Sequence, residues 1–284
     1  MTRILACIDA SGYAASVVQL AGWAARGLGA EIELLHVVQR KDAVAARQDH
    51  SGAIGLGAKS ELLDELTRID AAAGRLAIEE GRIILEAGAA TLQDAGFAVT
   101  PLHRHGGIVE TIVEREADAA LVVIGKRGAS GQFATDHIGS KVERVVRASE
   151  KPVLIAPRDA KRTPQRVVIA YDDSMAATRA VAMVATSALF DDLPVHLVSA
   201  GARAADGRDI LERAAEPLRK SGRQVETIVD DGRPEQVIGD YLAEHPDAIL
   251  VMGAYGHSPL RTLIVGSTTT TMIRTVHVPI LLVR

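Results

Sequence analysis

The chain contains one internal repeat, and this repeat restricts the fold more than any other feature of the sequence. The segment RILACIDAS near the start returns as RVVIAYDDS after the middle, with an aspartate and a serine at matching places. Four matched segments keep the same order: 3–11 with 166–174, 119–128 with 248–256, 139–140 with 266–267, and 151–156 with 278–283. A repeat of this kind predicts two homologous halves.

A polar, proline-bounded stretch at 157–165 predicts a linker between the halves. The domains are therefore 1–157 and 166–284, and a length of 284 residues is enough for two. From the first aspartate to the first motif glycine there are 125 − 9 = 116 positions in the first half and 253 − 172 = 81 in the second. The difference, 116 − 81 = 35, predicts a helical insert at about 39–75.

Within each half, continuous apolar runs alternate with amphipathic stretches. Strands are expected at 3–8, 32–38, 97–103, 120–124, 152–156, 166–171, 194–199, 223–229, 248–252 and 279–283, and helices at 11–28, 60–95, 107–116, 139–148, 174–190, 207–221, 234–244 and 266–276. This alternation predicts an α/β fold with a parallel sheet covered on both faces. Ligands of such sheets bind beyond the carboxyl ends of the strands, at the point where the strand order switches.

The first strand of each half ends at an aspartate, Asp9 in one half and Asp172 in the other. A carboxylate at this point can accept hydrogen bonds from a base amino group or a ribose hydroxyl. The alternative is that each aspartate is a second helix cap, because Ser11 and Ser174 lie two positions later and suit the N-cap position of the next helix.

A glycine motif follows the fourth strand of the second half, with the spacing Gly253, two residues, Gly256, nine residues, Gly266. Gly253 lets the chain turn off the strand, and Gly256 lets a backbone approach a phosphate without a Cβ in the way. Gly266 is followed by Ser267 and Thr268, which open a helix whose free N–H groups and dipole favour an anion. His257, beside Gly256, is either a further phosphate donor or an exposed loop side chain.

With these motifs the sequence resembles the universal stress protein family in its tandem two-domain form, over essentially the whole chain. The resemblance implies two Rossmann-like five-stranded parallel-sheet domains, of the type shared with adenine nucleotide alpha hydrolases. It also implies ATP across the switch point, with Mg²⁺ or Mn²⁺ beside the phosphates. The implied contacts in the second half are Asp172, Ala200, Gly253, Gly256, Gly266, Ser267 and Thr268. The last strands, 152–156 and 279–283, are expected to pair as an internal pseudo-dimer, and a homodimer is left open.

The first half departs from the pattern. Its matching positions are Asp9, Val37, Gly125, Gly128, Gly139 and Ser140, but ten residues rather than nine separate Gly128 from Gly139. Lys141 and Val142 replace the hydroxyl residues that follow. The first site is therefore predicted to be degenerate, with Lys126 and Arg127 either compensating as phosphate ligands or simply solvated.

Other motifs and the composition exclude several classes of function. Gly52–Ser60 nearly spells a Walker A loop, but Ala58 separates the last glycine from the Lys-Ser pair, so we expect no P-loop. His103 and His105 lack a third ligand at metal spacing and are assigned a structural or surface role. A net charge of 32 − 36 = −4 and 3% aromatic residues argue against nucleic acid. The single Cys7 and the strand-length apolar runs predict a cytoplasmic protein with no membrane span.

The sequence therefore predicts a stress-response regulatory protein that binds ATP in its C-terminal domain. No general base or arginine finger accompanies the motif, so at most slow ATP hydrolysis is expected, and no catalytic or metal-binding residue is assigned. One alternative is an interaction scaffold that binds no nucleotide, with the 39–95 region as its partner surface. The other is an enzyme on a related adenine-nucleotide fold, which ranks last because the Ser-Gly-Gly-x-Asp-Ser loop of ATP pyrophosphatases is absent.

Overall fold

Short runs of apolar residues form the central strands, which are buried between helices on both faces, whereas the two edge strands are half-polar and partly exposed. The computed structural model describes residues 2–38, 56–128, 140–160, 162–201, 204–254 and 267–284. Its strands are β1 (Arg3–Cys7), β2 (Glu31–Val38), β3 (Val99–His105), β4 (Ala119–Gly125), β5 (Val153–Ala156), β6 (Arg166–Ala170), β7 (Val195–Ala200), β8 (Val225–Asp230), β9 (Ala248–Gly253) and β10 (Ile280–Val283). Each of the ten strands expected from the sequence is present.

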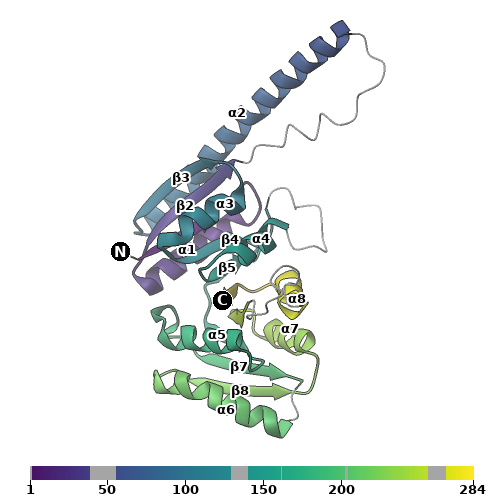
Figure 1. The fold of residues 1–284 in the computed structure, drawn as a ribbon. Coiled ribbons are helices and arrows are strands. Elements are labelled where there is room, and N and C mark those ends of the chain that lie inside the picture. The colour runs from purple at the N-terminus through teal and green to yellow at the C-terminus, as the bar shows by residue number, and fades with distance from the viewer. Residues whose placement is uncertain (1, 39–55, 129–139, 161, 202–203, 255–266) are drawn as a thin grey trace.

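The strands form one sheet in the order β3-β2-β1-β4-β5-β10-β9-β6-β7-β8 (Figure 1). All neighbours within a half are parallel. The halves meet through β5 and β10, which pair antiparallel with Leu154 opposite Leu281. The predicted internal pairing of the last strands is therefore confirmed. Because this junction is antiparallel, the strands of the two halves run in opposite directions, and the order switches between β1 and β4 and again between β6 and β9.

Helices cover both faces of the sheet. They are α1 (Ala14–Leu28), α2 (Leu56–Asp94), α3 (Ile108–Arg115), α4 (Ser140–Ala148), α5 (Met175–Thr186), α6 (Ala204–Lys220), α7 (Pro234–Glu244) and α8 (Ser267–Thr275), with short 3₁₀ turns η2 (Glu116–Asp118) and η4 (Ala188–Phe190). The apolar core on one face is built with α1, α2, α5 and α6, and the core on the other face with α3, α4, α7 and α8. Both cores run across the junction, and Trp23 of α1 meets Phe190 of η4 with ring centroids 6.4 Å apart.

The two predicted serine caps have different outcomes. Ser174 is the N-cap of α5, and its hydroxyl accepts a hydrogen bond from the Ala177 amide at 3.1 Å. The prediction for Ser11 is wrong, because α1 begins at Ala14 and its N-cap is Tyr13. The Ser11 hydroxyl instead accepts from the Tyr13 amide at 3.3 Å, within the turn that precedes the helix. The extra turn delays the helix in the first half only.

The described part of the predicted insert, from residue 56 on, lies in the N-terminal part of α2, a helix of 39 residues. Leu85, Gly88 and Leu92 are buried against the body of the first half, whereas Ile69 and Leu76 are 55% and 72% exposed. Figure 1 shows the N-terminal part of α2 extending well away from the sheet. Residues 56–60, the end of the near-Walker segment, are helical, and the absence of a P-loop stays an expectation. Its start lies outside the described residues.

Candidate functional site

The switch point of the second half lies between two neighbouring strands, β6 and β9, which pair with Ala170 opposite Met252. Asp172 follows β6, and Gly253 is the last residue of β9. One carboxylate oxygen of Asp172 accepts a hydrogen bond from the Ser174 amide at 3.1 Å, which forms a turn leading into α5. The side chain remains exposed, so this turn holds a carboxylate at the rim of the sheet.

Gly253 is required by packing rather than by the turn that we assigned to it. Its backbone is not among the glycines with positive φ. A methyl group at this position would place its carbon 2.6 Å from both Ala176 Cβ and Ala177 N, in the first turn of α5. Without a side chain, β9 and α5 approach closely beside Asp172. The glycine therefore shapes the switch point by letting a helix N-terminus reach the strand end.

The structure describes only some of the other residues predicted to contact a ligand in the second half. Ala200 ends β7 and precedes Gly201, whose φ is 78°. Thr268 lies in the first turn of α8, but its hydroxyl donates to Glu235 Oε1 at 2.7 Å. This hydrogen bond lowers the pKa of the Glu235 carboxyl. Ser267 begins α8, while Gly256, His257 and Gly266 lie outside the described residues.

The switch point of the first half, between β1 and β4, has the same turn after its aspartate. One oxygen of Asp9 accepts from the Ser11 amide at 3.1 Å. A methyl group on Gly128 would lie 2.9 Å from Asp9 Oδ2, so the loop backbone is in contact with this carboxylate. On Gly125 it would lie 2.7 Å from Tyr13 Cβ. The backbone at Gly128 therefore lies against the carboxylate, and the degeneracy of this site stays a prediction.

The remaining positions assigned to the first half are only partly described. Val37 lies near the end of β2, paired with Arg104 of β3. Ser140 begins α4, and Gly139 lies outside the described residues. Nothing further about their contacts bears on a ligand, so their roles stay predictions.

Lys126 is not a solvated side chain, so that interpretation is wrong, whereas its role as a phosphate ligand stays a prediction. It is 8% exposed, and its ammonium donates to the backbone oxygen of Val276 at 2.8 Å, which joins the two halves. The backbone oxygen of Ser149, which corresponds to Val276 in the repeat, accepts a hydrogen bond at 2.6 Å from Arg284, the residue that follows β10. Each acceptor follows the last turn of a helix, where cations are favoured. The hydrogen bond from Lys126 therefore attaches the residue that follows β4 to the second half.

Burial, followed by the charge of Arg127, lowers the pKa of Lys126 from its ordinary value of 10.5 to about 8. Between pH 8 and 10.5 the unfolded chain therefore binds more protons than the folded chain, so this group makes stability rise with pH. From pH 8 to 9.5 the wild type should gain roughly 1.5 kcal/mol relative to Lys126→Met. Urea unfolding of both proteins across this range measures the difference. Parallel pH curves for the two proteins would contradict the assignment.

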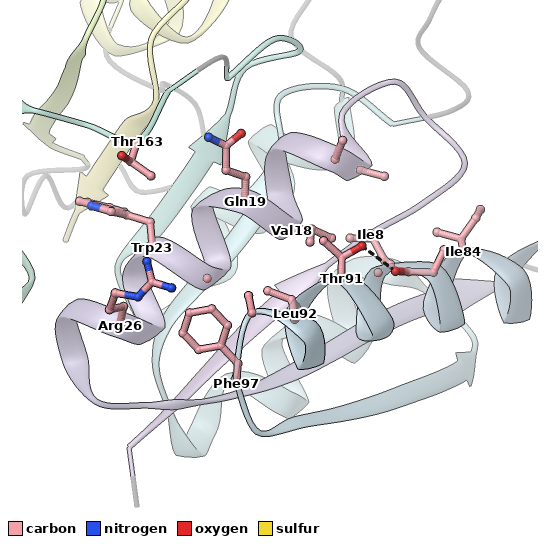
Figure 2. Close-up of a pocket in the computed structure, with 16 residues that line it drawn as sticks. Ile8, Val18, Gln19, Trp23, Arg26, Ile84, Thr91, Leu92, Phe97 and Thr163 are labelled. Carbon is pink, nitrogen blue, oxygen red and sulfur yellow. Dashed lines mark hydrogen bonds between the residues drawn. The ribbon is translucent and has the colours of Figure 1, made fainter.

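A cavity of about 570 Å³ lies between α1 and α2, away from Asp172 and Gly253 (Figure 2). Figure 2 shows Trp23, Arg26 and Phe97 around one end of it, with Ile84 and Thr91 contributed by α2. The guanidinium of Arg26 lies over the Phe97 ring, 5.2 Å from its centroid. The sequence does not predict this cavity, because apolar residues that line a cavity and apolar residues that fill a core have the same local pattern. Its mostly apolar lining offers few partners for a polyphosphate.

Three histidines lie close together on β2 and β3, and two of them, His103 and His105, are those to which the sequence analysis assigns a structural or surface role. His103 lies directly opposite His36 in the pairing of β3 with β2, and their ring centroids are 5.1 Å apart. His105 follows on the same strand, with its ring 5.7 Å from that of His103. The third histidine was not found from local spacing, because it comes from a different strand.

The parallel sheet and its two switch points, each with an aspartate and a glycine beside it, define a doubly wound α/β protein. The sequence matches the description "Universal stress protein family" over residues 1–157 and 164–284, and the chain belongs to this family. It is 33% identical over 288 residues to the universal stress protein Slr1230 of Synechocystis, with the whole of both chains covered.

Solved structures agree with the fold. A universal stress protein from Archaeoglobus fulgidus has a TM-score of 0.73 at 23% identity, covering 99% of this chain and 98% of that one. The protein PA1789 of Pseudomonas aeruginosa has a TM-score of 0.63 at 16% identity, covering 100% of this chain and 92% of that one. Among the described residues, no helix has the length and hydropathy needed to cross a membrane.

Proposed function

We propose that this protein is a cytoplasmic stress-response regulator that binds ATP in its C-terminal half. The observation that supports this most is the placement of Asp172 and Gly253 on neighbouring strands at the β6/β9 switch point. The first turn of α8, which follows the glycine motif, supplies free backbone N–H groups and the positive end of a helix dipole. A polyphosphate is the class of ligand that this combination suits best.

Each predicted contact has a chemical role in the proposal. The exposed oxygen of Asp172 accepts from a ribose hydroxyl or the base amino group, and the end of β7 at Ala200 borders the base. The segment from Gly256 to Thr268 surrounds the phosphates, with His257 as a further donor. Thr268 must leave Glu235 before its hydroxyl can donate to a phosphate. The carboxylate of Glu235 therefore competes with the nucleotide, and nucleotide binding shifts this equilibrium.

The proposal includes Mg²⁺ or Mn²⁺ only as a companion of the phosphates. In the part of the chain that the structure describes, no three His, Cys, Asp or Glu side chains form a group that could hold a metal. These residues therefore do not fit a metal site of the chain's own, and we route no step through an ion. The regulatory effect rests on binding, with ATP turnover absent or slow.

Calorimetric titration of the full chain with ATP tests the proposal. Asp172→Asn keeps an oxygen for the Ser174 amide but removes the negative charge, and we expect affinity to fall about tenfold, as for a lost hydrogen bond to a charged group. The matched control is Asp230→Asn. Asp230 ends the edge strand β8 and forms the same turn, accepting from the Gly232 amide at 3.0 Å, two strands from the switch point. This control should bind ATP like the wild type.

Equal affinities for the wild type and Asp172→Asn would contradict the site.

The competing function, an interaction scaffold, is favoured by one observation: Ile69, Leu76 and Ile83 are exposed on α2 at seven-residue intervals. This spacing places them along one side of the helix, as in helices that pack on a partner helix. No bound nucleotide after purification, together with no thermal shift at millimolar ATP, would favour the scaffold.

A further inference from the structure

The N-terminal part of α2 carries a seven-residue repeat. Ile69, Leu76 and Ile83 follow one another at intervals of seven residues, and a second row of positions lies four residues after each of them. Together the two rows alternate intervals of four and three residues, which is the repeat of helices that pair side by side in a coiled coil. In chain order the eight positions, which we call the stripe, are Leu62, Leu66, Ile69, Ala73, Leu76, Glu80, Ile83 and Ala87.

The stripe does not face the body of the first half. Its members Ile69, Leu76 and Ile83 are 55%, 72% and 53% exposed. The helix packs on the sheet with another side, on which Leu85 and Leu92 are buried. Leu85 lies two positions after Ile83, which is about 200° around the helix. The stripe therefore points away from the side that holds α2 on the body, and its first part lies where α2 extends beyond the sheet (Figure 1).

The stripe runs into the cavity between α1 and α2 (Figure 2). Ala87 belongs to both, and Ile84 and Thr91 line the cavity from the same side of α2. The opposite wall is formed by α1, with Val18 and Trp23 among its lining residues. The exposed stripe and the mostly apolar cavity therefore form one continuous surface, along which a second helix can lie.

The sizes of the side chains along the stripe fit a second copy of the same helix in antiparallel orientation. One row of the described stripe is large and the other is small: Ile69, Leu76 and Ile83 against Ala73 and Ala87. In an antiparallel pair each row faces the other row of the partner, so every alanine meets a large side chain. In a parallel pair each row faces itself, which places alanine against alanine and brings the two Glu80 carboxylates together.

One antiparallel register pairs all eight positions of the stripe. It places Ala73 opposite the partner's Leu76, and Glu80 opposite the partner's Ile69. The two sheets then lie at opposite ends of the helix pair, because each α2 joins its own sheet near its C-terminal end. In this register the first turns of each α2 lie beside the cavity of the other copy.

The charged side chains beside the stripe are compatible with this pairing. Arg82 forms ion pairs with Glu79 and Glu86, each at 2.5 Å, and Arg68 pairs with Glu65 at 3.7 Å. These glutamates are thus compensated within their own helix, so two copies can approach without an excess of one charge. Glu80, which is exposed, is a carboxylate within the stripe itself, and its burial opposes association.

We propose that the stripe and the cavity form a dimerisation surface, on which α2 of a second copy packs in antiparallel orientation. In the dimer, the helix of each chain covers the cavity of the other. The β5–β10 pairing is already made within one chain, so this surface joins two complete chains. The proposal does not depend on ATP binding.

Sedimentation equilibrium of the full chain without nucleotide tests the proposal. The wild type should be a dimer that dissociates on dilution. Leu76→Glu should raise the dissociation constant of the dimer about a hundredfold, because each dimer would bury two added charges in place of two leucines. Leu76 is 72% exposed in one chain, so this variant should keep the circular dichroism spectrum of the wild type.

Ile78→Glu is the matched control for Leu76→Glu. Ile78 is also an exposed apolar residue of α2, at 41%, but it lies two positions after Leu76 and therefore points to nearly the opposite side of the helix. Its substitution should leave the dissociation constant unchanged.

Glu80→Leu is a second variant, and it should act in the opposite direction. It replaces the carboxylate within the stripe by an apolar side chain, so the dissociation constant should fall at least tenfold. A folding defect cannot produce a tighter dimer, so this result separates a direct role of the stripe from a structural one.

A disulfide test determines the orientation of the two helices. Ile83→Cys is combined with Cys7→Ser, which removes the free cysteine of the chain. The two copies of position 83 are neighbours in a parallel pair but about 25 Å apart in the antiparallel register, too far for a disulfide. We therefore expect no disulfide on oxidation. A wild type that is monomeric at every concentration, a dimer unaffected by Leu76→Glu, or a disulfide between the two copies of position 83 would overturn the proposal.

Discussion

Gly253→Ala is expected to lower the free energy of unfolding by about 3 kcal/mol, at the upper end of what overpacking costs. The added carbon would meet backbone atoms of α5, including Ala177 N at 2.6 Å, and a backbone cannot rotate away as a side chain can. Either α5 or the end of β9 must move, which opens the switch point beside Asp172. Urea unfolding followed by circular dichroism measures the change.

Gly239→Ala provides the matched control for this prediction. Gly239 lies within α7, and a methyl group there meets nothing within 4 Å, so alanine should stabilise the helix by about 0.5–1 kcal/mol. Gly125→Ala, at the equivalent place in the first half, should cost less than Gly253→Ala, because its methyl group would meet one atom closer than 3.0 Å, Tyr13 Cβ at 2.7 Å, whereas that of Gly253→Ala would meet three. A loss below 0.5 kcal/mol for Gly253→Ala would show that α5 does not pack against β9 as described.

Glu33→Gln is expected to be similarly destabilising, by about 3 kcal/mol, because it breaks a buried ion network. Glu33 lies in β2, is 3% exposed, and accepts hydrogen bonds from Arg3 at 2.9 Å and from Arg115 at 2.8 and 2.5 Å. The amide keeps the shape of the side chain but leaves two neighbouring guanidinium groups without their shared counter-charge. The measurement is the shift of the urea unfolding midpoint at constant slope.

Glu31→Gln serves as the control for Glu33→Gln. Glu31 is on the same strand and the same face, two positions earlier, but it is exposed. Its substitution should change stability by less than 0.5 kcal/mol, as is usual for surface positions. If the two variants lose equal stability, the effect belongs to the strand and not to the ion network.

Most of the fold could be predicted from the sequence, because the repeat and the alternation of apolar runs are local patterns. Pairing of the last strands was also expected, and β5 does pair with β10. Ser11 shows where local reasoning fails: the serine suits a cap by residue type, yet the turn through Tyr13 delays the helix. Nothing in the local pattern distinguishes this turn from the direct start after Ser174.

The candidate sites depend on contacts between distant residues, which a single sequence does not reveal. The acceptor for Lys126 lies 150 residues away in the other half, so its burial could not be predicted from the loop motif. Likewise, the partner of Thr268 is Glu235, which precedes it by 33 residues on another helix. The partner of His103 is His36, which only the register of β2 with β3 reveals. The sequence shows which chemical groups these residues carry, but it does not show which residues lie next to them in the fold.

The antiparallel junction of β5 and β10 has a consequence for how the two halves work together. Because the strands of the halves run in opposite directions, their switch points face opposite rims of the ten-stranded sheet. No molecule as small as a mononucleotide can touch both. A ligand bound at one switch point therefore cannot block or occupy the other. Any coupling between the two switch points must pass through the strand backbones and the two cores that cross the β5–β10 junction.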